Sequence, residues 1–367
     1  MKITTFKIIT FLVLIPLLSF SNTPLKGKYK KTKEISKTFE ANDDTILNIK
    51  NSFGNIDIVT WDTNRIEIDV TITVSGNDEE AIEKKLEDIR IQFEKSNNQV
   101  HATTHSGKSK SKSWFSSNWF RWNSSSNINF RIDYKVKMPT ENDLNIYNDY
   151  GTINLNELNG KANINCDFGK LIIGSLNNTT NEIHCDYTKN SVIDFVESAS
   201  IYADFSNFTI EEANDIKLNG DYTTSEFTNI KNLKYNCDFG KLTIDKVANI
   251  HGSSDYLSLH IGELSNSATI STDFGSIKID LLKKGFKNLN IKSDYTGIKI
   301  GIDSDASCNI YSELSFGNLK YDGDLFTFNK VKEKTTEKEY QGYFNNENTN
   351  ATITTETEFG SIRFYQK

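Results

Sequence analysis

One feature constrains the fold of this chain more than any other: a short motif recurs about every 18 residues through its second half. The motif is usually Asp, then Phe or Tyr, then most often Gly, Ser or Thr, and an alternating apolar run follows it. Successive aromatics lie 18, 19, 18, 17, 17, 17, 18, 21, 21 and 43 residues apart, and Phe53 is an outlying copy. The repeated aromatics are Tyr150, Phe168, Tyr187, Phe205, Tyr222, Phe239, Tyr256, Phe274, Tyr295, Phe316 and Phe359.

Each repeat unit holds two short runs in which apolar and polar residues alternate, as at residues 162–166 and 171–173. Strict alternation is typical of a half-buried strand. A two-strand unit cannot bury its own apolar face, whereas stacked units can. The sequence therefore predicts an all-β protein, a β-solenoid (β-helix) with strands about 4.8 Å apart along the stack. A sandwich or a propeller is the alternative, but propeller repeats run to about 40 residues or more.

The repeated aromatics alternate between Tyr and Phe. Phe favours a dry core, while a Tyr hydroxyl needs a partner or water, so the alternation predicts two environments for side chains that point inward. Coils of about 36 residues would place a Phe ladder on one side and a Tyr ladder on the other. Coils of about 18 residues with alternating rungs are the other solution, and the sequence leaves both open.

Composition supports this architecture and excludes two classes of protein. The length of 367 residues would suggest two or three domains, but the repeat favours one series of stacked units. A thin core explains a hydrophobic share of only 37%, and the 3 prolines suit a backbone whose N–H groups are needed in ladders. The net charge of −7 argues against a nucleic-acid-binding protein, which ordinarily carries an excess of basic residues. Aromatics at 11% argue against a disordered chain.

The first 21 residues read as a secretory signal peptide. Lys2 and Lys7 precede an apolar run at residues 8–20, and Ser19 and Ser21 suit cleavage before Asn22. The run is shorter than the roughly 20 residues of a membrane span, although an uncleaved anchor helix is the alternative. Export would place the chain where disulfides are permitted.

The remaining regions divide by their patterns. Residues 22–34 are expected to be flexible, 35–145 to form an N-terminal β region, 146–325 the repeats, 326–341 a charged loop and 342–367 the terminal strands. Within the N-terminal region, residues 46–58 and 66–74 alternate as strands around a turn at 61–64. The pattern Ile82, Leu86, Ile89 and Phe93 predicts a helix over 78–94 that covers an end or flank of the sheet.

Residues 106–127 form a serine-rich segment that also contains several aromatic and basic residues, and its polar surroundings predict that the aromatics are exposed. Trp presents a flat area to sugars, cations or a membrane interface, which favours a binding loop. A hairpin tip whose aromatics fold back onto the sheet is the alternative. The candidate binding residues are Trp114, Phe115, Trp119, Phe120, Arg121 and Trp122.

The Asp that precedes each aromatic has two interpretations. In the first, the aligned carboxylates hold Ca²⁺ as a cation ladder, and Ca²⁺ is the one cofactor that the sequence suggests. In the second, each Asp accepts backbone N–H groups at a coil corner. Adjacent carboxylates would repel by roughly 1 kcal/mol in water. The Gly-rich spacing of calcium β-rolls is absent from the sequence. The residues are Asp149, Asp167, Asp186, Asp204, Asp221, Asp238, Asp255, Asp273 and Asp294.

Three of the four cysteines, Cys166, Cys185 and Cys237, stand directly before the motif Asp, where other units hold small residues; Cys308 stands apart. This position is expected to be a tight, buried slot on the face of the inward aromatic. Cys166 and Cys185 can form a disulfide only if their units stack directly.

The sequence resembles the DUF4097-type, adhesin-like β-strand repeat proteins of Bacteroidota. The resemblance is carried by residues 47–61, which include Asn51-Ser52-Phe53-Gly54, and by residues 134–139 followed by 144–155. It covers roughly residues 35–365. It implies an exported β-helical protein with an adhesive or envelope role and without established catalytic residues.

The expected function is that of a non-enzymatic adhesin-like or structural protein of the cell envelope. It would present a rigid β-ladder to a polysaccharide or an envelope protein, in the periplasm, on the outer surface or after secretion. No nucleophile elbow, phosphate loop or spaced metal motif is recognisable among the residues. A periplasmic sensing module linked to envelope stress is the first alternative, and an enzyme acting on polysaccharide is the second.

Overall fold

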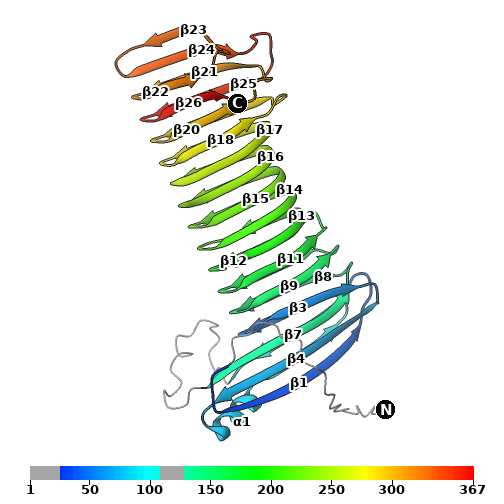
Figure 1. Ribbon diagram of the computed structural model, residues 1–367. Coiled ribbons are helices and arrows are strands. Elements are labelled where there is room, and N and C mark those ends of the chain that lie inside the picture. The colour runs from blue at the N-terminus through cyan, green and yellow to red at the C-terminus, as the bar shows by residue number, and fades with distance from the viewer. Residues whose placement is uncertain (1–24, 108–127) are drawn as a thin grey trace.

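The computed structural model describes residues 25–107 and 128–367, which form 26 strands and one helix. Figure 1 shows an elongated stack of strands with an N-terminal group at one end and a C-terminal hairpin at the other. The strands form a long sheet that does not close into a barrel. The predicted all-β, solenoid-like architecture is confirmed.

Each motif marks one coil of the stack, and each coil has two arms. The arm before the aromatic pairs in parallel with the same arm of the next coil, as β10 does with β8 and β12. The arm after the aromatic does likewise, as β11 does with β9 and β13. The bounds are β8 (Asp143–Asp149), β9 (Thr152–Leu158), β10 (Ala162–Asp167), β11 (Lys170–Leu176), β12 (Asn181–Asp186) and β13 (Ser191–Tyr202).

Consecutive motifs therefore stack directly, as the register Asp149↔Asp167↔Asp186 shows. A coil contains about 18 residues, and the alternative of 36-residue coils is wrong. Stacking at this short period lets each unit bury its apolar face against both neighbours.

In the middle of the stack both arms belong to one strand that continues around the bend opposite the aromatic corner. From β13 to β16 the paired residues are offset by 17, whereas flanking coils are offset by 19 and 21. The extra residues of those longer coils lie in turns at 177–180 and 283–287. The continuous strands are β13, β14 (Asn207–Asp221), β15 (Thr224–Asp238), β16 (Gly240–Asp255) and β17 (Leu257–Asp273).

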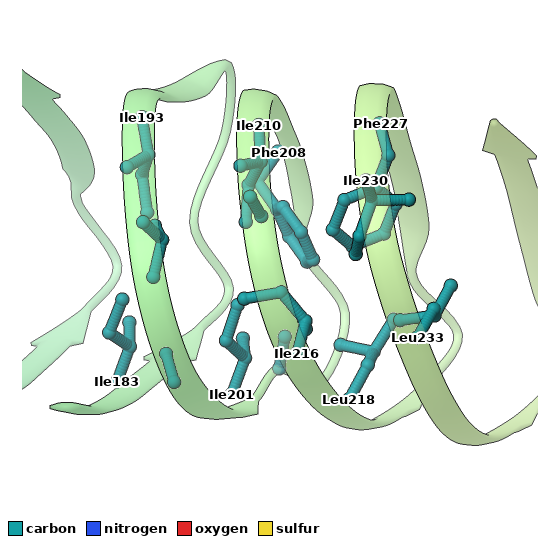
Figure 2. Packing of buried hydrophobic residues seen from close by; sticks show 14 of the residues in the cluster. Ile183, Ile193, Ile201, Phe208, Ile210, Ile216, Leu218, Phe227, Ile230 and Leu233 are labelled. Carbon is teal, nitrogen blue, oxygen red and sulfur yellow. The ribbon is translucent and has the colours of Figure 1, made fainter. Parts of the chain in front are cut away.

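The core is a thin layer between the two arms. Ile193, Ile210 and Phe227 stack in register on one arm, and Ile201 and Leu218 stack on the other. All five are buried, and Figure 2 shows such side chains directed into the space between the arms. Each buried side chain of this size contributes about 1.5–3 kcal/mol relative to an exposed one.

The N-terminal region extends the stack by one coil and then caps it. β2 and β3 pair in parallel with β8 and β9, so Phe53 is the first rung of the repeat rather than an outlier. On one arm β7 pairs in parallel with β3, and β4 and β1 follow it in antiparallel order. On the other arm β6 pairs in parallel with β2, and β5 pairs with β6 in antiparallel orientation. The bounds are β1 (Tyr29–Glu40), β2 (Ile46–Ser52), β3 (Ile56–Trp61), β4 (Arg65–Gly76), α1 (Glu79–Asp88), β5 (Arg90–Ser96), β6 (Gln99–His105) and β7 (Asn129–Pro139).

Two expectations for this region are corrected. Residues 29–34, expected to be flexible, belong to β1, because pairing with β4 orders them. The helix ends at Asp88 instead of continuing to 94, since Ile89 is extended at φ −78° and ψ 122°. Residues after it form β5, because Ile91 and Phe93 also alternate with period two and β6 offers an antiparallel partner. The helix packs beside β1 and β4 at the end of the stack, as its amphipathic pattern predicts.

At the other end the chain inserts its last coil out of order. β25 lies between β19 and β21, and β26 lies between β20 and β22. The interval of 43 residues before Phe359 thus contains a capping hairpin rather than a missing motif. The bounds are β18 (Ser276–Leu282), β19 (Asn288–Asp294), β20 (Gly297–Ile302), β21 (Cys308–Ser315), β22 (Asn318–Asp322), β23 (Phe326–Glu333), β24 (Glu337–Phe344), β25 (Thr352–Glu358) and β26 (Ser361–Gln366).

The segment 326–341 is therefore not a loop, as its charge suggested, but most of the antiparallel hairpin β23–β24. Lys330 and Lys332 on β23 both pair with Glu339 on β24, at 2.5 and 2.9 Å. A hairpin at the end of a stack is partly solvated on both faces, so its strands carry charges where inner strands carry aliphatic residues. Such an edge also discourages edge-to-edge association.

Candidate functional site

The aromatic residues of the motif form one continuous ladder along the corner of the stack. Neighbouring rings lie 4.8–5.0 Å apart between centroids, with interplanar angles of 1–10°. In spatial order the rungs are Phe53, Tyr150, Phe168, Tyr187, Phe205, Tyr222, Phe239, Tyr256, Phe274, Tyr295, Phe359 and Phe316.

The ladder is on the outside of the protein. From Tyr150 to Phe316 the rings are 42–59% exposed, so the expectation of inward aromatics in two environments is wrong. Each of the twelve rung residues has a positive φ of 49–65°, the left-handed region. One left-handed residue interrupts the inward–outward alternation, which turns the ring out although the residue two positions earlier points in.

This backbone conformation is unusual for aromatic residues. A left-handed conformation costs roughly 1–2 kcal/mol for a side chain with a Cβ atom and ordinarily favours Gly or Asn. Each inner ring, however, stacks on two neighbours, and an aromatic pair contributes about 0.5–1.5 kcal/mol beyond its buried area. The corner N–H is satisfied as well, since that of Phe168 donates to the carbonyl oxygen of Asp186 at 2.9 Å. The stack thus offsets the local conformational cost.

Stacking also decides which part of each ring can meet a ligand. The faces of the inner rings are covered by their neighbours, so the solvent-facing side of the ladder consists of ring edges. The edge of an aromatic ring is its electropositive part. The Tyr hydroxyls recur on every second rung along most of the ladder.

A column of carboxylates runs beside the rings. The Asp residues of successive coils are in register, and Glu358 continues them after Asp294. In the central coils each Asp accepts the backbone N–H of the next one: Asp186 from Asp204 at 3.1 Å, Asp204 from Asp221 at 2.9 Å and Asp238 from Asp255 at 2.8 Å. These bonds are the ones expected of a corner Asp.

The carboxylates of this column lie close enough for their negative charges to raise one another's pKa, as Asp167 shows. Burial raises the pKa of Asp167, and the neighbouring Asp149 and Asp186 raise it further. No group of three or more His, Cys, Asp or Glu side chains in residues 25–107 and 128–367 is arranged to hold a metal ion. The Ca²⁺ ladder remains a hypothesis, for which calorimetric titration and a calcium-dependent shift of the melting temperature are the tests.

All four cysteines are buried free thiols. Cys166 and Cys185 face each other in register, since their coils stack directly. Burial raises the pKa of each of the four thiols to about 12. The small-residue slot is therefore an inward position, as predicted, although the aromatic two residues later is not on its face.

A groove of about 760 Å³ lies along the bend of the central coils. Its lining residues belong to the first part of the arm that precedes the aromatic corner. Its lining includes one residue from each of several successive coils in direct register: Glu182, Ser200, Lys217, Lys234, His251 and Thr269. Sequence reasoning missed this groove and the exposure of the ladder. The run of 17-residue intervals was the available signal for the smooth bend.

At the bend, Asp215, Asn232 and Asn249 also line the groove and belong to a ladder of hydrogen-bonded side chains. Asn232 donates to Asp215 at 2.7 Å, and Asn249 donates to Asn232 at 2.8 Å. Asn266 continues the series with a bond of 2.6 Å to Asn249. These bonds fix the side chains and leave each amide with further donor and acceptor capacity.

Two predicted features receive no structural description. The signal peptide and the aromatics of the Trp/Ser-rich segment lie outside the described residues. Within the described ranges, no helix is both long and apolar enough to cross a membrane.

No protein-family model matches this chain, and no curated protein sequence matches it. Among solved structures, a protein from Clostridium sporogenes provisionally named a cell adhesion protein shares 13% identity, with a TM-score of 0.19 over 92% of this chain and 100% of that one. Provisionally named adhesins from Parabacteroides merdae and Parabacteroides distasonis share 10% and 9%, with TM-scores of 0.37 and 0.36. They cover 90% and 91% of this chain and 96% and 97% of their own.

These names agree with the adhesin-like resemblance of the sequence, whereas membership of the DUF4097 family stays a prediction. Identities of 9–13% and TM-scores below 0.5 carry no argument about what this chain does. Its function has to be inferred from its own surface.

Proposed function

We propose that this protein is an exported, non-enzymatic adhesin-like protein of the cell envelope that binds an extended partner along its aromatic ladder. The observation that carries the proposal is the continuous line of half-exposed rings along the stack. Contiguous exposed apolar surface on a soluble protein commonly marks an interaction site.

The ladder suits a long partner better than a small one. Successive rings offer the same contact once per coil, and the tyrosine hydroxyls add a hydrogen-bonding group on every second rung. Weak contacts of this kind add up when one partner spans many of them. A surface polysaccharide or an envelope protein is the proposed partner.

Ring-to-Asn substitutions test this role. Asn tolerates the left-handed conformation, so it removes the ring while the corner can keep its shape. We expect the full chain with Phe205, Tyr222, Phe239 and Tyr256 replaced by Asn to fold but to lose most binding to cell envelopes. Replacement of Ile172 and Val331, exposed apolar residues away from the ladder, by Asn is the matched control and should leave binding unchanged.

Unchanged binding by the folded ladder variant would contradict the proposal. Location is tested separately by protease treatment of intact cells, which should degrade the protein if it is displayed on the surface. In the same assays, replacement of Trp114, Trp119 and Trp122 by Ser tests the proposed second contact surface at residues 106–127.

A further inference from the structure

The groove at the bend has a different chemistry from the ladder. Lys217 and Lys234 lie directly opposite each other in adjacent strands, and His251 follows in the next coil. Like charges placed opposite each other on neighbouring strands are destabilising. In the part of the chain that the structure describes, neither lysine forms an ion pair.

Two carboxylates also line the groove and keep their negative charge, but within the described residues neither forms an ion pair with a lysine. Asp215 accepts a hydrogen bond from Asn232, and Glu182 lies 2.8 Å from the ring nitrogen of His184. Among the described residues, the ammonium groups of Lys217 and Lys234 thus have no carboxylate within ion-pair distance, whereas the chain as a whole has a net charge of −7. Two lysines that lie opposite each other in a polar groove without an ion-pair partner favour an anionic ligand.

The shape of the groove narrows the class of ligand. Its lining repeats once per coil, about 4.8 Å apart, over coils whose strands pass smoothly around the bend. The turns at 177–180 and 283–287 belong to the longer flanking coils on either side. The amide ladder and the hydroxyls of Ser200 and Thr269 add hydrogen-bonding groups along the same line.

We propose that this groove binds a linear anionic polysaccharide that lies along the stack with an acidic sugar near each lysine. A coil rise of about 4.8 Å is close to the length that one sugar ring adds to an extended chain, so such a chain can run along the groove in step with the coils. The polar lining suits sugar hydroxyls. This site is separate from the aromatic ladder and does not depend on the function proposed for it.

The probe is an oligomer of galacturonic acid, and its fully methyl-esterified form provides the same backbone without charge. Calorimetric titration of the full chain should detect the acidic oligomer and not the ester. Binding should weaken as salt is raised, because exposed charge pairs are screened. Replacement of both Lys217 and Lys234 by Gln should weaken binding at least tenfold.

The matched control replaces Lys241 and Lys299, two exposed lysines on the other arm, by Gln. It should bind the acidic oligomer as the unmodified chain does, and so should the ladder variant with four Asn substitutions. The groove variant should melt no lower than the unmodified chain, because it relieves repulsion between two lysines.

Three results would overturn the proposal: equal binding of the ester, equal loss in both lysine variants, or unchanged binding by the groove variant. Tighter binding of poly-glutamate would assign the groove to acidic peptides instead, and tighter binding of single-stranded DNA would assign it to nucleic acid. Either result would also overturn the proposal.

Discussion

The chain passes from one arm of a coil to the other at two places, the aromatic corner and the bend, and the two are built differently. At the aromatic corner the chain reverses through one left-handed residue, and stacked rings and Asp-to-backbone bonds hold it. At the bend of the central coils the strand continues without a break, and amide side chains hydrogen-bond from coil to coil. The corner is apolar and acidic, whereas the bend is polar and carries two lysines that form no ion pair within the part of the chain that the structure describes.

The difference shows how a solenoid can carry two surfaces without two domains. The corner needs a specific residue at one position per coil, so it repeats visibly in the sequence. The bend requires only that no extra residues are inserted between the two arms, so it produces little recognisable pattern in the sequence. Four predictions test this contrast, from the largest expected effect to the smallest.

The close contact between the backbones of adjacent coils at the corner should be the feature whose disruption costs the most stability. A Cβ atom on Gly151 would lie 1.8 Å from the carbonyl oxygen of Gly54 in the preceding coil. Because backbone cannot move aside easily, Gly151→Ala should destabilise the protein by about 3 kcal/mol. Chemical denaturation measures this loss. Gly297→Ala, where nothing lies within 4 Å of the added atom, is the control and should change stability by less than about 0.5 kcal/mol.

Removal of one inner ring should have an intermediate effect. Phe205 stacks on Tyr187 at 5.0 Å and on Tyr222 at 4.9 Å. Phe205→Asn loses both contacts but regains some stability from the left-handed preference of Asn, so we expect a loss of about 1–2 kcal/mol. Phe205→Tyr keeps the stack and should be nearly neutral in the same unfolding experiment. An equal loss for both variants would show that stacking does not hold the corner.

The bend should tolerate the loss of one ladder member better than the corner. Asn249 donates to Asn232 at 2.8 Å and accepts from Asn266 at 2.6 Å. These side chains are half-buried, and their groups can turn to water, so Asn249→Ala should cost about 1 kcal/mol. A loss larger than that of Phe205→Asn, measured by the same denaturation, would reverse the proposed order of the two ends.

The smallest effect should be electrostatic and dependent on pH. The folded pKa of Asp167 is raised above its unfolded value of about 3.9. The folded state therefore favours the protonated form, and stability is lost as pH rises through the folded pKa. Asp167→Asn removes the charge but keeps an oxygen acceptor, so it should raise the melting temperature slightly at pH 7. The gain should shrink as pH falls through the folded pKa and vanish at about pH 3, below the unfolded pKa, and a gain that persists there would refute this cause.

The repeat was sufficient to predict the solenoid, the two-strand unit and the buried cysteine slot. The same pattern misled about the aromatics, because alternation places Phe168 inside unless the corner residue is known to be left-handed. It also misled about residues 326–341, where charge indicates solvent on both faces but does not separate a loop from an edge hairpin. In the N-terminal region the positions after Ile89 fitted a helix and a strand equally well, and only pairing with β6 decided between them.

The sequence by itself determined the two-strand unit of about 18 residues, since local alternation and the spacing of aromatics depend only on residues near one another in the chain. That one unit makes one coil was decided by the parallel register between strands. Tertiary structure decided which residues share a surface. The insertion of Phe359 between Tyr295 and Phe316 comes from pairing between strands far apart in sequence. The meeting of Lys217 and Lys234 comes from a bend without extra residues, because register between coils, and not local sequence, sets which side chains lie side by side.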